Sequence, residues 1–203
     1  MTNFPAATIL LSTALACASA SADTLNFEPL GSAELTSTTL TLDGAVIKGF
    51  GTSFYIFASD VDLGLTSGEG GAICSAFRPT SDRLSCAADM QISFKTAVSA
   101  LNFRTFGDDD GDSVKISAYA GDTLLGTPQV VTSNTVVDFS ALSGVTKLVF
   151  DDQSTGPDGG SGFAFGKFSF TPSVSPVPEP ATGLMMVLGI AAMGGFARRR
   201  RAG

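Results

Sequence analysis

Four aspartates within five residues, in the run Asp108-Asp109-Asp110-Gly111-Asp112, form the most concentrated group of metal-binding side chains in the sequence. Aspartates around a glycine turn can direct several carboxylate oxygens at one Ca²⁺ ion, which takes about six to eight oxygen ligands. A second acidic turn, at Asp151-Asp152, supplies further carboxylate oxygens if the fold brings the two loops together. The predicted calcium ligands are Asp108, Asp110, Asp112, Asp151 and Asp152. The alternative is a solvated turn in which Asp and Gly adopt positive φ without a metal.

Paired carboxylates also suggest catalysis on a sugar. A glycosidase holds two Asp or Glu residues about 5–10 Å apart, and its general acid needs a raised pKa. The acidic residues are concentrated in predicted loops, where solvent keeps pKa values ordinary, and Glu28 beside Phe27 comes closest to an apolar setting. The chain has no histidine, which excludes Ser-His-Asp hydrolysis and His-ligated zinc. We predict a non-enzymatic protein, with a glycosidase-like enzyme as the less favoured alternative.

Of the three cysteines, Cys17 lies in an N-terminal segment that is expected to be removed on export, which leaves Cys74 and Cys86. An even number of cysteines in an exported chain indicates a disulfide. Closing a loop of this length stabilises a fold by about 3 kcal/mol in the chain-entropy model. A redox or metal role would need a Cys-x-x-Cys spacing or further ligands, so we predict a structural disulfide.

The elements that must position these residues show a period of two, which is typical of strands with one buried face. Leu101 and Phe103 alternate with Asn102 and Arg104. Further strands are predicted at residues 40–42, 114–118, 136–139 and 148–150. Turn residues separate the strands at intervals of about ten residues, as in a sandwich. We predict an all-β fold: an antiparallel, jelly-roll-like β-sandwich over residues 23–171.

The last predicted strand contains four phenylalanines in changing register. Phe163 and Phe165 occupy odd positions, whereas Phe168 and Phe170 occupy even ones. One extra residue at Gly166-Lys167, a β-bulge, would place all four on one face. The alternative is a strand packed between two apolar layers.

The N-terminus has the pattern of a secretory signal peptide, expected to be helical, over residues 1–22. An apolar stretch at residues 6–18 is followed by Ala20-Ser21-Ala22, the small-x-small pattern that signal peptidase reads. We predict cleavage after Ala22, so that the mature chain begins at Asp23.

The C-terminus has the pattern of a membrane anchor. The apolar run from Ala181 to Ala197 is 17 residues long and uncharged, and predicts a short transmembrane helix. Four arginines follow in the segment 198–203 and are expected to stay in the cytoplasm, so that the body is exported. A buried core helix with a basic tail is the alternative. A linker at residues 172–180 precedes the run. The residues expected to form the signal are Val177, Pro178, Glu179, Pro180, Arg198, Arg199, Arg200 and Arg201.

This Pro-Glu-Pro segment, apolar helix and arginine cluster resemble the PEP-CTERM sorting tail of Gram-negative bacteria. The resemblance implies that an exosortase, a membrane peptidase, cuts near Pro178-Glu179-Pro180 and releases or transfers the protein outward. It also implies a precursor anchored in the inner membrane, processed by signal peptidase and exosortase. The mature form is expected at the outer surface or in the extracellular matrix of an exopolysaccharide-producing bacterium.

The body resembles small exported sandwich domains that are distantly like carbohydrate-binding modules. The matching segments are Leu25-Asn26-Phe27-Glu28, Leu101-Asn102-Phe103 and Gly160-Ser161-Gly162-Phe163. In many of those proteins the last strand contains an acidic pair, where this chain has Gly166 and Lys167.

The charge of the body limits its partners. Residues 23–177 contain eight Lys and Arg against eighteen Asp and Glu, a net charge of −10, which disfavours nucleic acid. We predict an exported, exosortase-sorted protein associated with exopolysaccharide. The alternative is a calcium-supported carbohydrate-binding module, which requires a concave face displaying Tyr55, Tyr119 or an exposed Phe, because the chain has no Trp.

Overall fold

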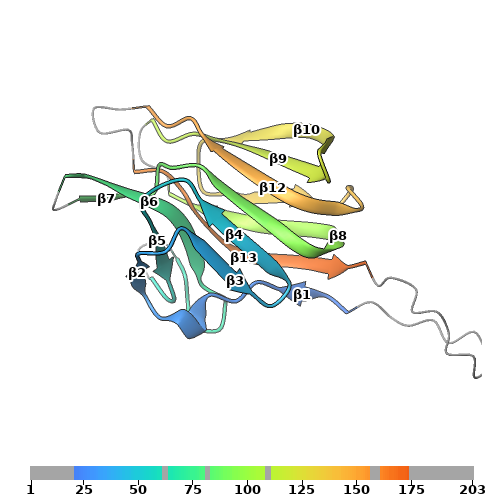
Figure 1. Cartoon of the computed structure of the whole chain (residues 1–203), viewed down its shortest axis with the longest axis horizontal. Helices are drawn as coiled ribbons and strands as arrows, with labels where there is room; N and C mark the ends of the chain where they lie inside the picture. Colours follow the sequence, from blue (N-terminus) through green and yellow to red (C-terminus); the bar gives the residue numbers. More distant parts are fainter. Residues whose placement is uncertain (1–20, 61–63, 81–82, 108–110, 156–160, 174–203) are drawn as a thin grey trace, which may run out of the picture.

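The computed structural model describes residues 21–60, 64–80, 83–107, 111–155 and 161–173, which form an all-β, antiparallel fold (Figure 1). The predicted signal and transmembrane helices lie outside these residues. Within the described ranges, no helix is long and apolar enough to cross a membrane. The elements are β1 (Asp23–Thr24), the 3₁₀ helix η1 (Glu28–Leu30), β2 (Ala33–Leu35), β3 (Thr39–Leu42), β4 (Ala45–Gly49), β5 (Ser53–Phe57), β6 (Ala72–Thr80), β7 (Arg83–Ser85), β8 (Met90–Phe106), β9 (Val114–Ala120), β10 (Thr123–Val131), β11 (Val136–Phe139), β12 (Val145–Asp152) and β13 (Ala164–Pro172).

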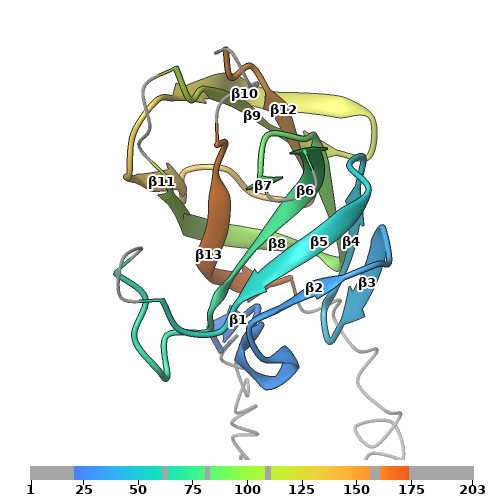
Figure 2. The same cartoon turned by 90° about the vertical axis from the view of Figure 1, so that its left-hand side faces the viewer.

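The long strand β8 organises the sheet because its two parts have different neighbours. Residues 90–98 pair with β12 and β4, and the following part pairs with β13 and β11. Ala100, with φ of 51°, lies between the two parts. The first half-sheet is thus β10-β9-β12-β8-β4-β3, and the second is β11-β8-β13-β6-β5-β2. Figure 2 shows β9, β10 and β12 above β13, β6 and β5.

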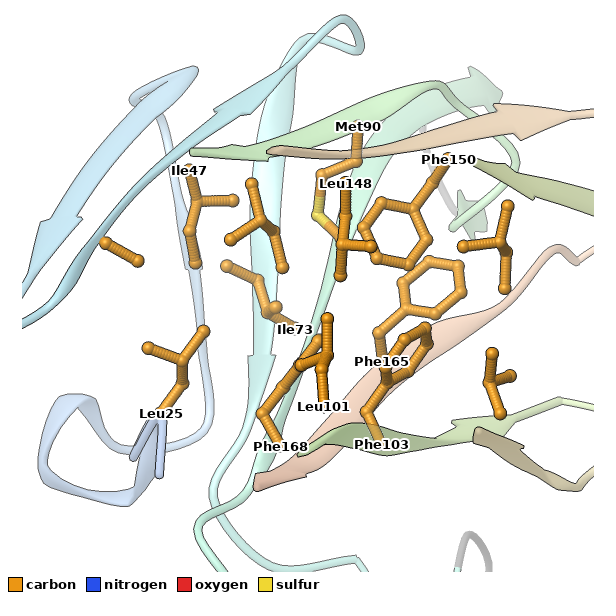
Figure 3. Packing of buried hydrophobic residues seen from close by; sticks show 14 of the residues in the cluster. Leu25, Ile47, Ile73, Met90, Leu101, Phe103, Leu148, Phe150, Phe165 and Phe168 are labelled. Carbon is orange, nitrogen blue, oxygen red and sulfur yellow. The ribbon is translucent and has the colours of Figure 1, made fainter. Parts of the chain in front are cut away.

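One large apolar cluster receives side chains from both half-sheets. The ring of Phe103 in β8 stacks on that of Phe168 at 4.8 Å between centroids, and meets Phe150 of β12 edge-on at 5.6 Å. Phe150 in turn lies 4.3 Å from Phe165 of β13. Figure 3 shows these rings converging from different strands. Burial of such rings is the main favourable term in folding.

The β-bulge predicted in the last strand is confirmed. The register of β13 against β8 shifts between Gly166 and Ser169, and Lys167 has a φ of 53°. All four phenylalanines of the strand therefore reach the same core cluster. Gly166 is required here, because a Cβ atom would lie 2.3 Å from the carbonyl oxygen of Gly71. An acidic side chain at this position has no room.

The alternation predicted for the middle strands is also confirmed. Leu101 and Phe103 are buried, while Asn102 and Arg104 between and beside them are partly exposed. On β9 the alternation holds at first, with Val114 and Ile116 buried on either side of the partly exposed Lys115, but it ends at Ser117, which is buried like its neighbours Ile116 and Ala118.

Candidate functional site

A groove of about 360 Å³ lies on the second half-sheet, on the face opposite the phenylalanine core. Side chains alternate between the two faces of a strand. Because Ile73 and Phe165 point into the core cluster, Cys74 and Ala164 belong to the other face, where a second, smaller apolar cluster forms. We call this pocket the aromatic groove and define it by Tyr55, Phe57, Leu84, Phe106 and Ala164, all of which line it.

The groove exists because small residues lie between large ones. Ala72, Ala76 and Ala164 occupy the middle of this face and are fully buried. Tyr55 and Phe57, both on β5, line the pocket with ring centroids 4.7 Å apart and planes inclined by 55°. Phe106, near the end of β8, lines the pocket together with them. Phe106 is 1% exposed, and the Arg104 guanidinium lies 5.4 Å from the centroid of its ring. The rings open to a flat apolar molecule are therefore those of Tyr55 and Phe57.

The disulfide predicted between Cys74 and Cys86 is present, with the two Cα atoms 5.4 Å apart. It ties β6 to the segment after β7 and so holds Leu84 and Cys86 against the groove. The backbone N–H of Cys86 also donates to the carbonyl of Ser161 at 2.7 Å. At Gly162 a Cβ atom would lie 2.4 Å from the backbone nitrogen of Ala87, so these two segments cross in close contact.

The polar part of the groove is an ion pair. The guanidinium of Arg78, which lines the pocket, donates to the carboxylate of Glu34. The Ser53 hydroxyl donates to the other oxygen of Glu34 at 2.8 Å. The Arg78 hydrogen bond, followed by that of Ser53, lowers the pKa of Glu34. The pair therefore stays ionised at neutral pH and carries no net charge.

The predicted calcium ligands are only partly described, since Asp108 and Asp110 lie outside the described residues. Asp112 is buried, and its Oδ1 accepts a hydrogen bond from the Gly162 N–H at 2.9 Å. The carboxylate of Asp151 forms an ion pair with Lys115 at 2.5 Å. In the described part of the chain, no group of three or more His, Cys, Asp or Glu side chains is arranged to hold a metal. Calcium binding stays a prediction.

The pKa of Asp152 is raised, whereas the sequence predicts ordinary pKa values for the acidic residues. Burial raises its pKa, hydrogen bonds from Ser154 oppose this, and the charges of Asp89 and Asp112 raise it further. The expectation that solvent keeps the pKa of the acidic residues ordinary is therefore wrong at Asp152, which is the last residue of β12 and is raised chiefly by its partial burial. Asp89 Oδ1 also accepts the backbone N–H of Asp152 at 2.9 Å.

The aromatic residues singled out in the sequence lie in different places. Tyr55 lines the groove, whereas Tyr119 lies on β9, with the Lys147 ammonium 4.9 Å above its ring. Phe50 is 58% exposed, in the loop between β4 and β5. Sequence reasoning missed Phe57, although its position two residues after Tyr55 places it on the same face of a strand. It also missed Phe106, whose place depends on the change of neighbours along β8.

The chain ends of the body meet far from the groove. Asp23, the predicted mature N-terminus, pairs with Phe170, and the N–H of Ser173 donates to the carbonyl of Ala97 at 2.7 Å. Ala164 in the groove begins the same strand that ends at Pro172, about 25 Å away at ~3.3 Å per residue. Figure 1 accordingly shows β1 and the end of β13 on one side and β5 and β7 on the other.

The segment that follows the last strand matches a known protein family. Residues 176–201 match the family model of the PEP-CTERM protein-sorting motif. This confirms the resemblance seen in the Pro-Glu-Pro segment and the terminal arginines. The motif is an exosortase recognition signal, so the protein is exported, from a membrane-anchored precursor, and sorted to the cell surface. No curated protein and no solved structure matches the chain.

Proposed function

We propose that the chain is a non-enzymatic protein of the outer surface or extracellular matrix, associated with exopolysaccharide in a Gram-negative bacterium. The observation that carries the proposal is the sorting motif at residues 176–201, directly after a folded all-β body. The body is a jelly-roll-like β-sandwich in this proposal. Two observations support this sandwich arrangement: the two half-sheets share β8, and both contribute side chains to one apolar cluster.

The proposed division of the chain follows the strands. A signal peptide over residues 1–22 leaves β1 intact, because β1 begins at Asp23. The body ends at residue 171, and the linker at 172–180 begins with the last residue of β13, Pro172. The transmembrane helix at 181–197 and the basic tail at 198–203 complete the proposed precursor.

The groove supports a binding role better than a catalytic one. Its nearby carboxylate, Glu34, has a lowered pKa, whereas the general acid of a glycosidase needs a raised one. Asp152 has a raised pKa but accepts a 2.8 Å hydrogen bond from Ser154 and does not line the groove.

Cosedimentation tests the proposal. The protein recovered from a producing strain is mixed with that strain's purified exopolysaccharide, with millimolar calcium or with excess chelator. Retention in both buffers is expected. Retention that is lost with chelator and in the Asp110→Ala variant would favour the calcium-supported carbohydrate-binding module. Absence of retention in both buffers would contradict association with exopolysaccharide.

A further inference from the structure

We propose that the aromatic groove binds a neutral sugar unit of an extracellular glycan. The inference rests on the proposed function, because it names the site and the ligand class through which the protein meets polysaccharide. It is carried by the shape of the groove, by the charges at its polar side and by its place on the body.

The shape of the groove suits a ring with an apolar face. A sugar ring presents C–H groups on its faces and hydroxyls around its edge. The inclined rings of Tyr55 and Phe57, both partly exposed, offer apolar surface at two angles, while Phe106 lines the pocket as a buried ring, 1% exposed. A volume of about 360 Å³ lies near the lower end of the range for small-molecule pockets, about 300–1,000 Å³. This size fits one or two sugar units better than a folded partner.

The charges favour a neutral ligand. Arg78 and Glu34 neutralise each other, and the Arg78 side chain is 43% exposed, so some of its five N–H donors stay available to hydroxyl oxygens. An anionic sugar would compete with Glu34 for Arg78. It would also approach a body whose residues 23–177 have a net charge of −10. A cationic ligand would meet the guanidinium of Arg104, which lies 5.4 Å from the centroid of the Phe106 ring.

The walls of the groove are fixed before a ligand arrives. The disulfide holds Cys86 to β6, and the hydrogen bond from Cys86 to Ser161 fixes the neighbouring segment. A preformed site loses little conformational entropy on binding. The groove also lies at the end of β13 opposite to Pro172, after which the sorting motif follows. An attachment through the C-terminus would therefore lie at the end of β13 away from the groove.

Tyrosine fluorescence gives a direct readout, because the chain has no Trp and two Tyr. The Tyr119→Phe variant leaves Tyr55, in the groove, as the single fluorophore. The protein is produced by export, so that the signal peptide is removed and the disulfide forms, and is purified in a detergent without a sugar headgroup. It is then titrated with tetrasaccharides of glucose, galactose, mannose and N-acetylglucosamine, and with tetragalacturonate as the acidic probe.

A saturable change in Tyr55 emission with at least one neutral tetrasaccharide is expected, with tetragalacturonate weaker. Phe57→Ala is expected to weaken binding about tenfold, because a ring supplies a large contact area. Arg78→Gln, a change at a part-exposed side chain that leaves the core intact, is expected to weaken it several-fold. Phe50→Ala is the matched control, since it removes an exposed ring outside the groove and should leave binding unchanged.

Each contrary result overturns the inference. No response to any neutral probe, or a stronger response to tetragalacturonate, would exclude a neutral sugar. Binding unchanged in both Phe57→Ala and Arg78→Gln would place the ligand elsewhere. Emission that changes with protein concentration alone would indicate that a second copy of the chain covers the groove. Cosedimentation with exopolysaccharide without any Tyr55 response would leave the proposed function standing and reject only the groove.

Discussion

The two faces of the second half-sheet differ in the size of their side chains. On the inner face, Phe103, Phe165 and Phe168 pack ring against ring in a closed core. On the outer face, Ala164 follows on β13 directly before Phe165, Ala72 lies on the paired strand β6, and the rings of Tyr55 and Phe57 lie on β5. Identical backbone pairing thus supports a filled interior and an open groove. The size of the side chains, more than the arrangement of the strands, therefore decides which face of this half-sheet is filled and which has a groove.

The largest expected effect comes from the inner face. Phe103→Ala removes a ring that contacts four others and is 1% exposed. The loss in free energy of unfolding is expected to be about 3–5 kcal/mol, as for other buried Phe to Ala changes. Denaturant unfolding of the variant beside Phe50→Ala, which removes an exposed ring, measures it. A loss of only about 0.5 kcal/mol, as is usual for a surface change, would contradict the contrast between the two faces.

The disulfide is expected to contribute less to stability but to matter for the outer face. Replacing both Cys74 and Cys86 by serine opens a link that spans 12 residues. About 3 kcal/mol of stability is expected to be lost in the chain-entropy model. Tyr55 fluorescence in the Tyr119→Phe background should also change, because Cys86 lines the same pocket as Tyr55. Unchanged fluorescence together with lost stability would separate the disulfide from the groove.

The ion pair at the bulge makes stability depend on pH. The Lys167 ammonium lies 2.7 Å from Glu69, and this hydrogen bond, with those from Thr66, lowers the pKa of Glu69 to about 2 from 4.5. The folded state therefore binds a proton less readily than the unfolded state. The stabilisation is full above pH 4.5 and is lost as the pH falls towards 2.

The Glu69→Gln variant sharpens this point. It is expected to be less stable than the wild type at pH 7 and to lose less stability on acidification. Thermal unfolding between pH 7 and pH 3 measures the difference. The control is Asp122→Asn, which removes a fully exposed carboxylate paired with Lys147 at 3.3 Å. If the melting temperatures of the wild type and Glu69→Gln changed with pH in the same way, the ion pair between Glu69, in the loop before β6, and Lys167, at the bulge, would not stabilise the fold.

The smallest expected effect concerns calcium at the acidic loops. If the predicted site fills, millimolar calcium raises the melting temperature of the wild type by a few degrees, and Asp110→Ala abolishes the rise. Glu28→Gln, outside these loops, is the control and should keep the response. A melting temperature that does not change with calcium or chelator would favour the solvated turn.

The sequence predicts those parts of the fold in which one face of a strand is polar. Alternation at Leu101 and Phe103, and the register change at Gly166, predict the second part of β8 and the bulge, but not the part of β8 at residues 90–98. It does not reveal β6, where residues 72–76 are buried without interruption and the period of two disappears. Strand β10 is missed for the opposite reason, because most of its residues are exposed.

The sorting motif can be recognised from the sequence, whereas the groove cannot. The motif is read as a continuous segment, so Pro178 and the arginines identify it without a fold. The groove combines Tyr55, Leu84 and Phe106 from three strands, and only pairing registers and the disulfide bring them together. Of its lining, the sequence singled out Tyr55 for an exposed binding face and Cys86 for the disulfide. It singled out Ser161 and Gly162 only as part of a segment that resembles other sandwich domains.

The most direct test of the account is the mass and location of the protein in a producing strain with and without its exosortase. We expect a surface or matrix form that begins at Asp23 and ends near Pro178-Glu179-Pro180. In the strain without exosortase, we expect a form that keeps its C-terminal arginines and stays with the inner membrane. The same mass and location in both strains would contradict exosortase sorting, and with it the proposed display of the groove at the cell surface.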